Sequence, residues 1–157
     1  NISSQIGGDL PAQAGIEITG KLDRLDWASR ADKTIRVVDY KTGGPKTMGE
    51  IEGKTKNSDG NLQRQLEFYK LLVDSDPGLN FKFGEALLDF VEEPLDKRKD
   101  GKRHILVSDE QVSTLRQTIV EAMANIRALN FPRTTNLKTC EKCYFKDHCY
   151  PGGLPSE

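Results

Sequence analysis

The sequence lacks the features that would place it in a membrane or in a disulfide-stapled scaffold. None of its apolar runs is long enough to cross a bilayer, and no signal-peptide pattern is found. It holds only three cysteines, all between residues 140 and 149, whereas a secreted scaffold uses pairs spread along the chain. These absences favour a cytoplasmic protein in a reducing compartment, with no membrane partner.

An excess of charge of one sign is missing as well. Lys and Arg number 23 against 24 Asp and Glu, which leaves a formal net charge of -1 and no global attraction to nucleic acid. Any phosphate binding must therefore come from local basic patches. What is present is 157 residues with 36% hydrophobic and 30% charged side chains, enough for one domain with a real core.

The hydrophobic pattern predicts an α/β fold with a mixed central sheet of about four strands and helices packed against it. Strands are expected over 16–27, 34–41, 81–92 and 104–107, and helices over 61–74 and 108–129. A charged hairpin tip is expected over 96–102. We interpret residues 1–15 as a linker or truncated edge, 16–135 as the core, and 136–157 as a cysteine-cluster tail of the same domain.

The strand at 34–41 ends in Asp39-Tyr40-Lys41. Because side chains alternate along a strand, Asp39 and Lys41 project to one face and Tyr40 to the other. A carboxylate beside an ammonium suits a hydrolytic site, where the carboxylate holds a metal and the lysine steadies a hydroxide or phosphate oxygen. The alternative is a solvated strand edge with a weak ion pair.

Three further side chains can join this pair. Asp23 lies on the preceding strand, and two carboxylates on adjacent strands can chelate one or two divalent cations, with a preference for Mg²⁺ or Mn²⁺ over Zn²⁺. Gln65 and Tyr69 are four residues apart on the predicted helix, so they share a face and could both reach the strand ends.

These segments resemble the RecB-type branch of the PD-(D/E)XK nuclease superfamily. The matching motifs are Gly20-Lys-Leu-Asp23-Arg24, Val38-Asp39-Tyr40-Lys41-Thr42-Gly43 and Gln65-Leu-Glu-Phe-Tyr69. The resemblance implies a restriction-endonuclease-like core and an Mg²⁺- or Mn²⁺-dependent DNA nuclease, a RecB-like exonuclease of DNA repair or recombination. It also implies a helicase domain or subunit as partner, with this chain as the C-terminal part of a helicase–nuclease.

By this resemblance Asp23 and Asp39 bind the metal, and the backbone carbonyl of Tyr40 is a further ligand. Lys41 is the catalytic lysine, and Gln65 and Tyr69 support the site and contact DNA. The family also has a helix before the first of these strands, which contributes a His or Glu; the leader shows no counterpart. We therefore expect a piece of a longer protein, whose catalytic site is incomplete without the upstream helix.

The cysteines extend the resemblance. In many members of the branch three such residues join one placed well upstream to hold a four-iron cluster, which assigns Cys140, Cys143 and Cys149 as ligands of a 4Fe-4S cluster or of Zn²⁺. The upstream cysteine is absent here. His148 is an alternative fourth ligand, although its adjacency to Cys149 makes joint coordination awkward. Three unligated thiols are the other interpretation.

The sequence indicates the residues that contact DNA less specifically than those of the catalytic site. Arg24, Lys46 and Arg64 are candidates for phosphate contacts, and each is equally an ordinary surface charge. Two other functions compete with the nuclease: a DNA-binding module that does not cut, and a metal-stapled domain whose partner is a protein. Cleavage, metal at the aspartates and salt-sensitive DNA affinity distinguish the three.

Overall fold

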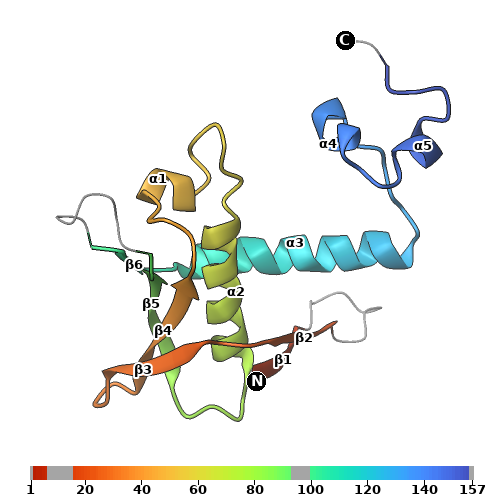
Figure 1. Cartoon of the computed structure of the whole chain (residues 1–157). Helices are drawn as coiled ribbons and strands as arrows, with labels where there is room; N and C mark the ends of the chain where they lie inside the picture. The colour runs from red at the N-terminus through yellow and green to blue at the C-terminus, as the bar shows by residue number, and fades with distance from the viewer. Residues whose placement is uncertain (1, 7–15, 93–99, 156–157) are drawn as a thin grey trace. The chain divides into compact units, whose positions relative to one another are not determined.

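The computed structural model describes residues 2–6, 16–92 and 100–155 (Figure 1). The chain forms two compact units, residues 1–121 and 122–157, and each is described by itself. The division falls inside helix α3 (Asp109–Arg127) rather than at residue 136, where the tail was expected to begin. The domain boundaries at 16 and 136 stay a prediction.

A four-stranded sheet forms the centre of the first unit. Its strands, in spatial order, are β3 (Arg24–Ser29), β4 (Thr34–Lys41), β5 (Lys82–Phe90) and β6 (Lys102–Ile105). β4 pairs antiparallel with β3 and parallel with β5, whereas β5 pairs antiparallel with β6. The parallel pair is possible because a helix lies between β4 and β5 in the chain. The predicted α/β class with a mixed central sheet is confirmed.

β4 carries the buried middle of this sheet. Its β-branched residues suit a pleated, covered surface, and its side chains alternate between the two faces. Asp39 contacts the helix α2 (Asn61–Ser75), so Ile35 and Val37 share the face that this helix covers. Both are at most 3% exposed. On the opposite face Tyr40 is exposed.

β5 keeps its apolar side chains on the helix-covered face by means of a bulge. Phe83 pairs with Ile35 and Glu85 pairs with Arg36, so Gly84 is inserted without a partner. A Cβ at Gly84 would lie 3.0 Å from the carbonyl oxygen of Ile35, which favours glycine here. Beyond the bulge the alternation restarts, and three side chains face the same way as Phe83: Ala86, Leu88 and Phe90.

Helix α2 crosses this face of the sheet (Figure 1), close to the predicted range of 61–74. Its N-cap is Gly60 at φ 70°, a left-handed conformation that glycine adopts without strain. The Asp59 carboxylate, just before this residue, accepts a hydrogen bond from the N–H of Asn61 at 3.1 Å. The helix buries Leu66, Leu71 and Leu72 completely.

Two strands precede the four-stranded sheet. β1 (Ile2–Ile6) and β2 (Ile16–Gly20) form a separate antiparallel pair against α2. The single strand expected over 16–27 is wrong, because residues 21–23 break it into β2 and β3. β1 was not expected inside the stretch 1–15, since its apolar residues are only the two isoleucines at its ends.

The loop 42–60 contains a short helix that was not expected, α1 (Met48–Ile51). Thr47 and Glu50 form a capping box at its start: each side chain accepts a hydrogen bond from the backbone N–H of the other. Ile51 is fully buried. The capping box and this anchor together attach the loop to the first unit.

Ser108 and Gln111 form a capping box at the start of α3. The N–H of Ser108 donates to Gln111 Oε1 at 2.8 Å, and the N–H of Gln111 donates to Ser108 Oγ at 3.2 Å. The expectation that α3 covers a sheet face is wrong within the first unit. Leu115 is its one buried residue, and the helix is joined instead to α2, where Arg116 donates a hydrogen bond to Ser75.

Residues 93–99, with most of the charged tip expected over 96–102, lie outside the described residues. The second unit continues from α3 into two short helices, α4 (Leu137–Glu141) and α5 (Lys146–Cys149). Among the described residues, no helix combines the length and apolar character needed to cross a bilayer.

Candidate active site

The candidate site is centred on Asp39, a buried carboxylate on β4. Its side chain is only 3% exposed because the strand alternation directs it under α2, into the apolar layer of Ile35 and Val37. A buried carboxylate is costly unless other groups compensate its charge. Its two oxygens have different surroundings.

One oxygen, Oδ1, is fully hydrogen-bonded by α2. The Tyr69 hydroxyl donates to it at 2.7 Å and the Gln65 side-chain amide at 3.2 Å. Burial, and then the hydrogen bond to Asp39, raise the pKa of Tyr69 above its ordinary value. The hydroxyl therefore remains protonated and remains a donor. The predicted i, i+4 pair of the helix does reach the strand.

The other oxygen, Oδ2, is buried without a hydrogen bond from any described residue. Its charged neighbour is Lys41 Nζ at 2.6 Å, close enough for an ion pair but without the geometry of a hydrogen bond. A buried anionic oxygen that lacks a directional donor and touches a cation is suited to a positive ion. This is the position in the site where a metal fits best.

Gln65 connects the lysine to the carboxylate. Its amide nitrogen donates to Asp39 Oδ1 and, at 2.7 Å, to the Tyr69 hydroxyl, while its Oε1 accepts from Lys41 Nζ at 2.6 Å. One side chain of α2 thus contacts three polar groups of the site. Lys41 is held between the amide and the carboxylate with 22% of its side chain exposed. The ammonium is therefore fixed, yet reachable from solvent.

Asp23 lies in the break between β2 and β3, and it is exposed. Its Oδ2 accepts a hydrogen bond from the backbone N–H of Tyr40 at 3.0 Å. That contact brings the second carboxylate to the residue that follows Asp39. Its negative charge also contributes to raising the pKa of Tyr69. The expectation that Asp23 lies on a strand is wrong, but this hydrogen bond to Tyr40 places its carboxylate beside the end of β4.

The donor set is made of oxygens, which suits Mg²⁺ or Mn²⁺. Asp23 and Asp39 supply carboxylates. Tyr40 follows Asp39 in the chain and donates its N–H to Asp23, and its backbone carbonyl is the group assigned as a further ligand. The described residues contain no group of three or more His, Cys, Asp and Glu side chains placed to hold a metal. Two carboxylates with an unsatisfied buried oxygen leave the remaining positions to backbone, water or substrate.

The three candidate DNA contacts are all exposed and already have partners within the chain. Arg24 donates to Asp26 at 2.8 Å and to the Tyr40 hydroxyl at 3.1 Å. The Arg64 guanidinium donates to the backbone carbonyl of Asp59, and Lys46 is paired weakly with a glutamate at 3.5 Å. Of the three, Arg24 is the one whose contacts tie it to a residue of the site.

The role of the Tyr40 side chain was missed by sequence reasoning, which considered only its carbonyl. Its ring lies on the face opposite Asp39, 41% exposed, with its hydroxyl bonded to Arg24. The antiparallel register pairs Arg24 with Val38, which places residues 24 and 40 on one face of the sheet. That register could have been inferred from the turn at 30–33.

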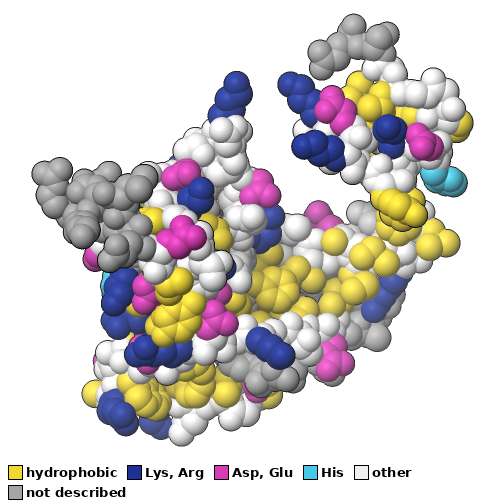
Figure 2. All heavy atoms as spheres, in the orientation of Figure 1, with side chains coloured by type: hydrophobic (Ala, Val, Ile, Leu, Met, Phe, Trp, Pro, Cys, Tyr) yellow, Lys and Arg dark blue, Asp and Glu magenta, His cyan; other side chains and the backbone are white. Residues whose placement is uncertain are grey.

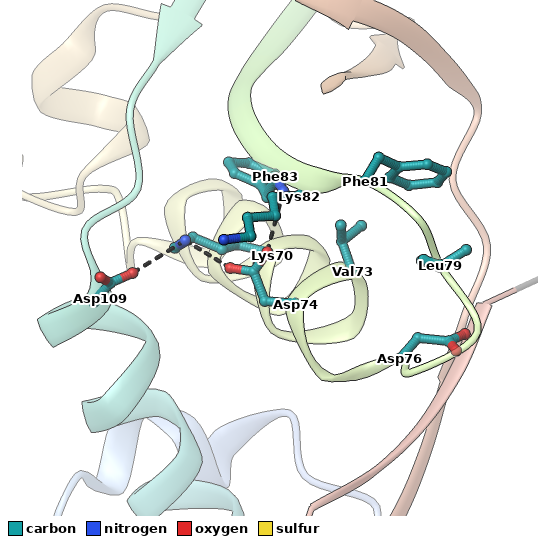
Figure 3. A pocket seen from close by; sticks show the side chains of 9 residues that line it. All are labelled: Lys70, Val73, Asp74, Asp76, Leu79, Phe81, Lys82, Phe83 and Asp109. Atoms are coloured by element: carbon teal, nitrogen blue, oxygen red, sulfur yellow. Dashed lines mark hydrogen bonds and ion pairs between the residues drawn. The ribbon is translucent and has the colours of Figure 1, made fainter. Parts of the chain in front are cut away.

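A second pocket of the first unit lies around Lys70 and contains none of the site residues (Figure 3). The Lys70 ammonium contacts Asp74 Oδ2 at 2.7 Å and Asp109 Oδ1 at 3.1 Å, and it lies over the ring of Phe83. Asp74 also accepts the N–H of Phe83 at 3.1 Å. These groups satisfy one another and join α2 to β5 and to the start of α3, so the cluster is structural.

The cysteines of the second unit are all free: Cys140 is buried, Cys143 exposed and Cys149 half-buried. All three line one hollow together with His148. The four side chains share this hollow, but among the described residues no three of them are placed to hold a metal ion. Their ligation of iron–sulfur or zinc stays a prediction.

The comparison with protein families gives one match. The model of the PD-(D/E)XK nuclease superfamily matches residues 2–150, which includes every residue of the candidate site and all three cysteines. No curated protein matches the sequence significantly.

Proposed function

Because the chain belongs to the PD-(D/E)XK nuclease superfamily, we propose that it is a divalent-metal-dependent nuclease that hydrolyses the phosphodiester bonds of DNA. The observation that carries the proposal is the buried Asp39 Oδ2, an anionic oxygen that lies beside Lys41 and receives no hydrogen bond from the described part of the chain. Neither group is needed by the apolar core around it. Both are suited to a reaction at phosphorus.

In this proposal Asp23, Asp39 and the Tyr40 carbonyl hold Mg²⁺ or Mn²⁺. Such an ion lowers the pKa of water and offsets charge that builds on a phosphodiester. Tyr69 and Gln65 fix the orientation of Asp39 through its Oδ1, which leaves Oδ2 as the free ligand. Their role is positioning, because Gln65 contacts Asp39 and Lys41 and Tyr69 contacts Asp39.

Lys41 is the group of the chain that acts on the reacting atoms. Its ammonium is fixed by Gln65 Oε1 and reaches solvent, so it can donate to the attacking water oxygen or to a non-bridging phosphate oxygen. In-line attack forms the new P–O bond while the bond to the leaving oxygen breaks. A fixed positive charge favours this step, since negative charge increases on the phosphate oxygens.

The narrower assignment follows from the three motifs in their order along the chain. We place the chain in the RecB-type branch, as a RecB-like exonuclease of DNA repair or recombination that works with a helicase domain or subunit. The hollow lined by Cys140, Cys143, His148 and Cys149 is the proposed position of a 4Fe-4S cluster or Zn²⁺. Thiolates are the ligands that both prefer.

A DNA-binding or protein-interaction module stapled by the cysteines is the alternative. One observation favours it: the Lys41 ammonium already neutralises the buried Asp39, so this carboxylate has a compensating positive charge without a metal. A degenerate nuclease would keep such a pair as a buried structural contact. Cleavage distinguishes the two functions directly.

The test is cleavage of end-labelled single- and double-stranded DNA in Mg²⁺ or Mn²⁺ by the chain and by Lys41→Ala. Lys54→Ala is the matched control, because Lys54 is 73% exposed and paired only with Glu52. Metal-dependent cleavage by the chain and by the control, absent in Lys41→Ala, is expected. Metal-independent DNA binding without cleavage by any of them would support the alternative.

A further inference from the structure

The second unit presents aromatic rings to solvent at a turn between its two short helices. Tyr144 is 95% exposed and Phe145 is 65% exposed. Single exposed apolar side chains are common, but two adjacent aromatic rings without covering contacts are a feature that demands an explanation. Both residues lie in the turn between α4 and α5.

The rings have a fixed mutual geometry. Their centroids are 5.6 Å apart and their planes meet at 84°, so the edge of one ring meets the face of the other. The turn beneath them is held by backbone hydrogen bonds from Cys143 N–H to the Cys140 carbonyl and from Lys146 N–H to the Cys143 carbonyl, each 3.1 Å. Rings on an ordered turn lose little conformational freedom when a ligand stacks on them.

The surroundings of the rings are basic, unlike the chain as a whole. Lys146 follows Phe145 directly in the sequence, and Lys142 is separated from Tyr144 by Cys143 alone. Among residues 122–155, five side chains are Lys or Arg and two are Asp or Glu, a net charge of +3, whereas the whole chain carries -1. Figure 2 shows Lys and Arg side chains distributed around hydrophobic ones on the visible face of this unit.

We propose that this surface, Lys142, Tyr144, Phe145 and Lys146, binds single-stranded DNA. The proposal rests on the proposed nuclease function and assigns its substrate class. Exposed rings stack on unpaired bases, and interleaved lysines neutralise the phosphates that connect them. In a duplex the bases are already stacked on one another, so the rings have no base face to bind. A protein partner would not require the lysines on both sides of the rings.

The experiment measures binding of a fluorescently labelled oligothymidylate to the full chain by anisotropy, in EDTA so that no hydrolysis occurs. The Tyr144→Ala/Phe145→Ala variant should bind about 5- to 150-fold more weakly, the range that corresponds to one stacked base. Tyr144→Phe keeps the ring and should retain the affinity. Because both side chains are exposed, the melting temperature of each variant should equal that of the parent chain.

Salt and duplex titrations complete the test. Lys142→Ala/Lys146→Ala should reduce the slope of log affinity against log salt by about 1.4, at ~0.7 for each single-strand phosphate contact, while Lys54→Ala should leave it unchanged. Equal losses for duplex and single strand, or no loss in the aromatic variant, would overturn the proposal. DNA cleavage by the parent chain and by Lys41→Ala is measured in a separate assay that contains Mg²⁺ or Mn²⁺. Failure of the nuclease proposal is therefore distinguishable from failure of the proposed single-strand binding surface.

Discussion

Tyr69→Phe is the change that tests most directly whether α2 stabilises the buried carboxylate. It removes one oxygen atom from a side chain that is 8% exposed and keeps the ring that packs in the core. The lost contacts are the 2.7 Å hydrogen bond to Asp39 Oδ1 and the 2.7 Å bond from Gln65 Nε2. No cavity of the size of a methyl group is created.

The size of the stability loss depends on the hydrogen bonds that Asp39 keeps in the variant. A hydrogen bond to a charged group contributes about 1.5–3 kcal/mol, and the lower end applies because Gln65 still donates to Oδ1. We expect the free energy of unfolding to fall by about 1.5–2 kcal/mol. For a chain of this size that corresponds to a decrease of about 3–8 °C in melting temperature.

Urea and thermal unfolding followed by circular dichroism measure this effect. Tyr144→Phe is the matched control, since it makes the same chemical change on a side chain that is 95% exposed, and it should alter stability by less than about 0.5 kcal/mol. If the two variants were equally stable, the Tyr69 hydroxyl would not be stabilising Asp39. The description of the site as a connected network would then be wrong.

Four other predictions follow from the same structure. Asp39→Asn removes a charged ligand and should weaken Mn²⁺ binding at least tenfold by calorimetry; an unchanged titration would contradict the metal assignment. Lys41→Ala takes away the cation beside Asp39 Oδ2, so its melting temperature should fall in EDTA and should rise more on addition of Mn²⁺ than that of the parent chain; equal increases would count against a metal at Oδ2. Cys143→Ser should abolish any visible charge-transfer absorption after anaerobic purification, and an identical spectrum excludes this thiol as an iron ligand. For Glu85, burial alone would raise the pKa, but the hydrogen bonds and charges of Arg36 and His104 outweigh it and lower the pKa below 4.5. Its stabilising effect is therefore present above pH 4.5 and is lost as the pH falls through the lower folded-state pKa, a loss that unfolding of Glu85→Gln at several pH values should not show.

The placement of the site residues could be predicted where local periodicity determines it. Alternation along β4 puts Asp39 and Lys41 on one face of the strand, and helical spacing puts Gln65 and Tyr69 on one face of α2. The two pairs come into contact if the helix covers that face of the strand. The structure shows that meeting in its hydrogen bonds. The catalytic and metal-binding roles remain predictions.

Other parts of the fold depend on contacts that periodicity does not encode. β1 has too few apolar residues to signal a strand, and it is ordered by its pairing with β2. α1 is one turn long and carries no periodic stripe, although its Thr47 and Glu50 are spaced as a capping box and could have revealed it. The break at residues 21–23 does have a signal in the sequence: the apolar residues are at even positions up to Leu22 and at odd positions from Leu25 to Trp27, and the prediction of one continuous strand overlooked this change of phase.

The bulge at Gly84 sets the phase of β5, and this has a consequence for how the chain can change by insertion and deletion. Deletion of one residue at the bulge would shift the register of β5 by one position. Every later side chain of the strand would exchange faces, so Leu88 and Phe90 would leave the layer beneath α2 and Asp89 would enter it. Length variation should therefore be tolerated in the loop 42–60 and selected against between residues 82 and 86.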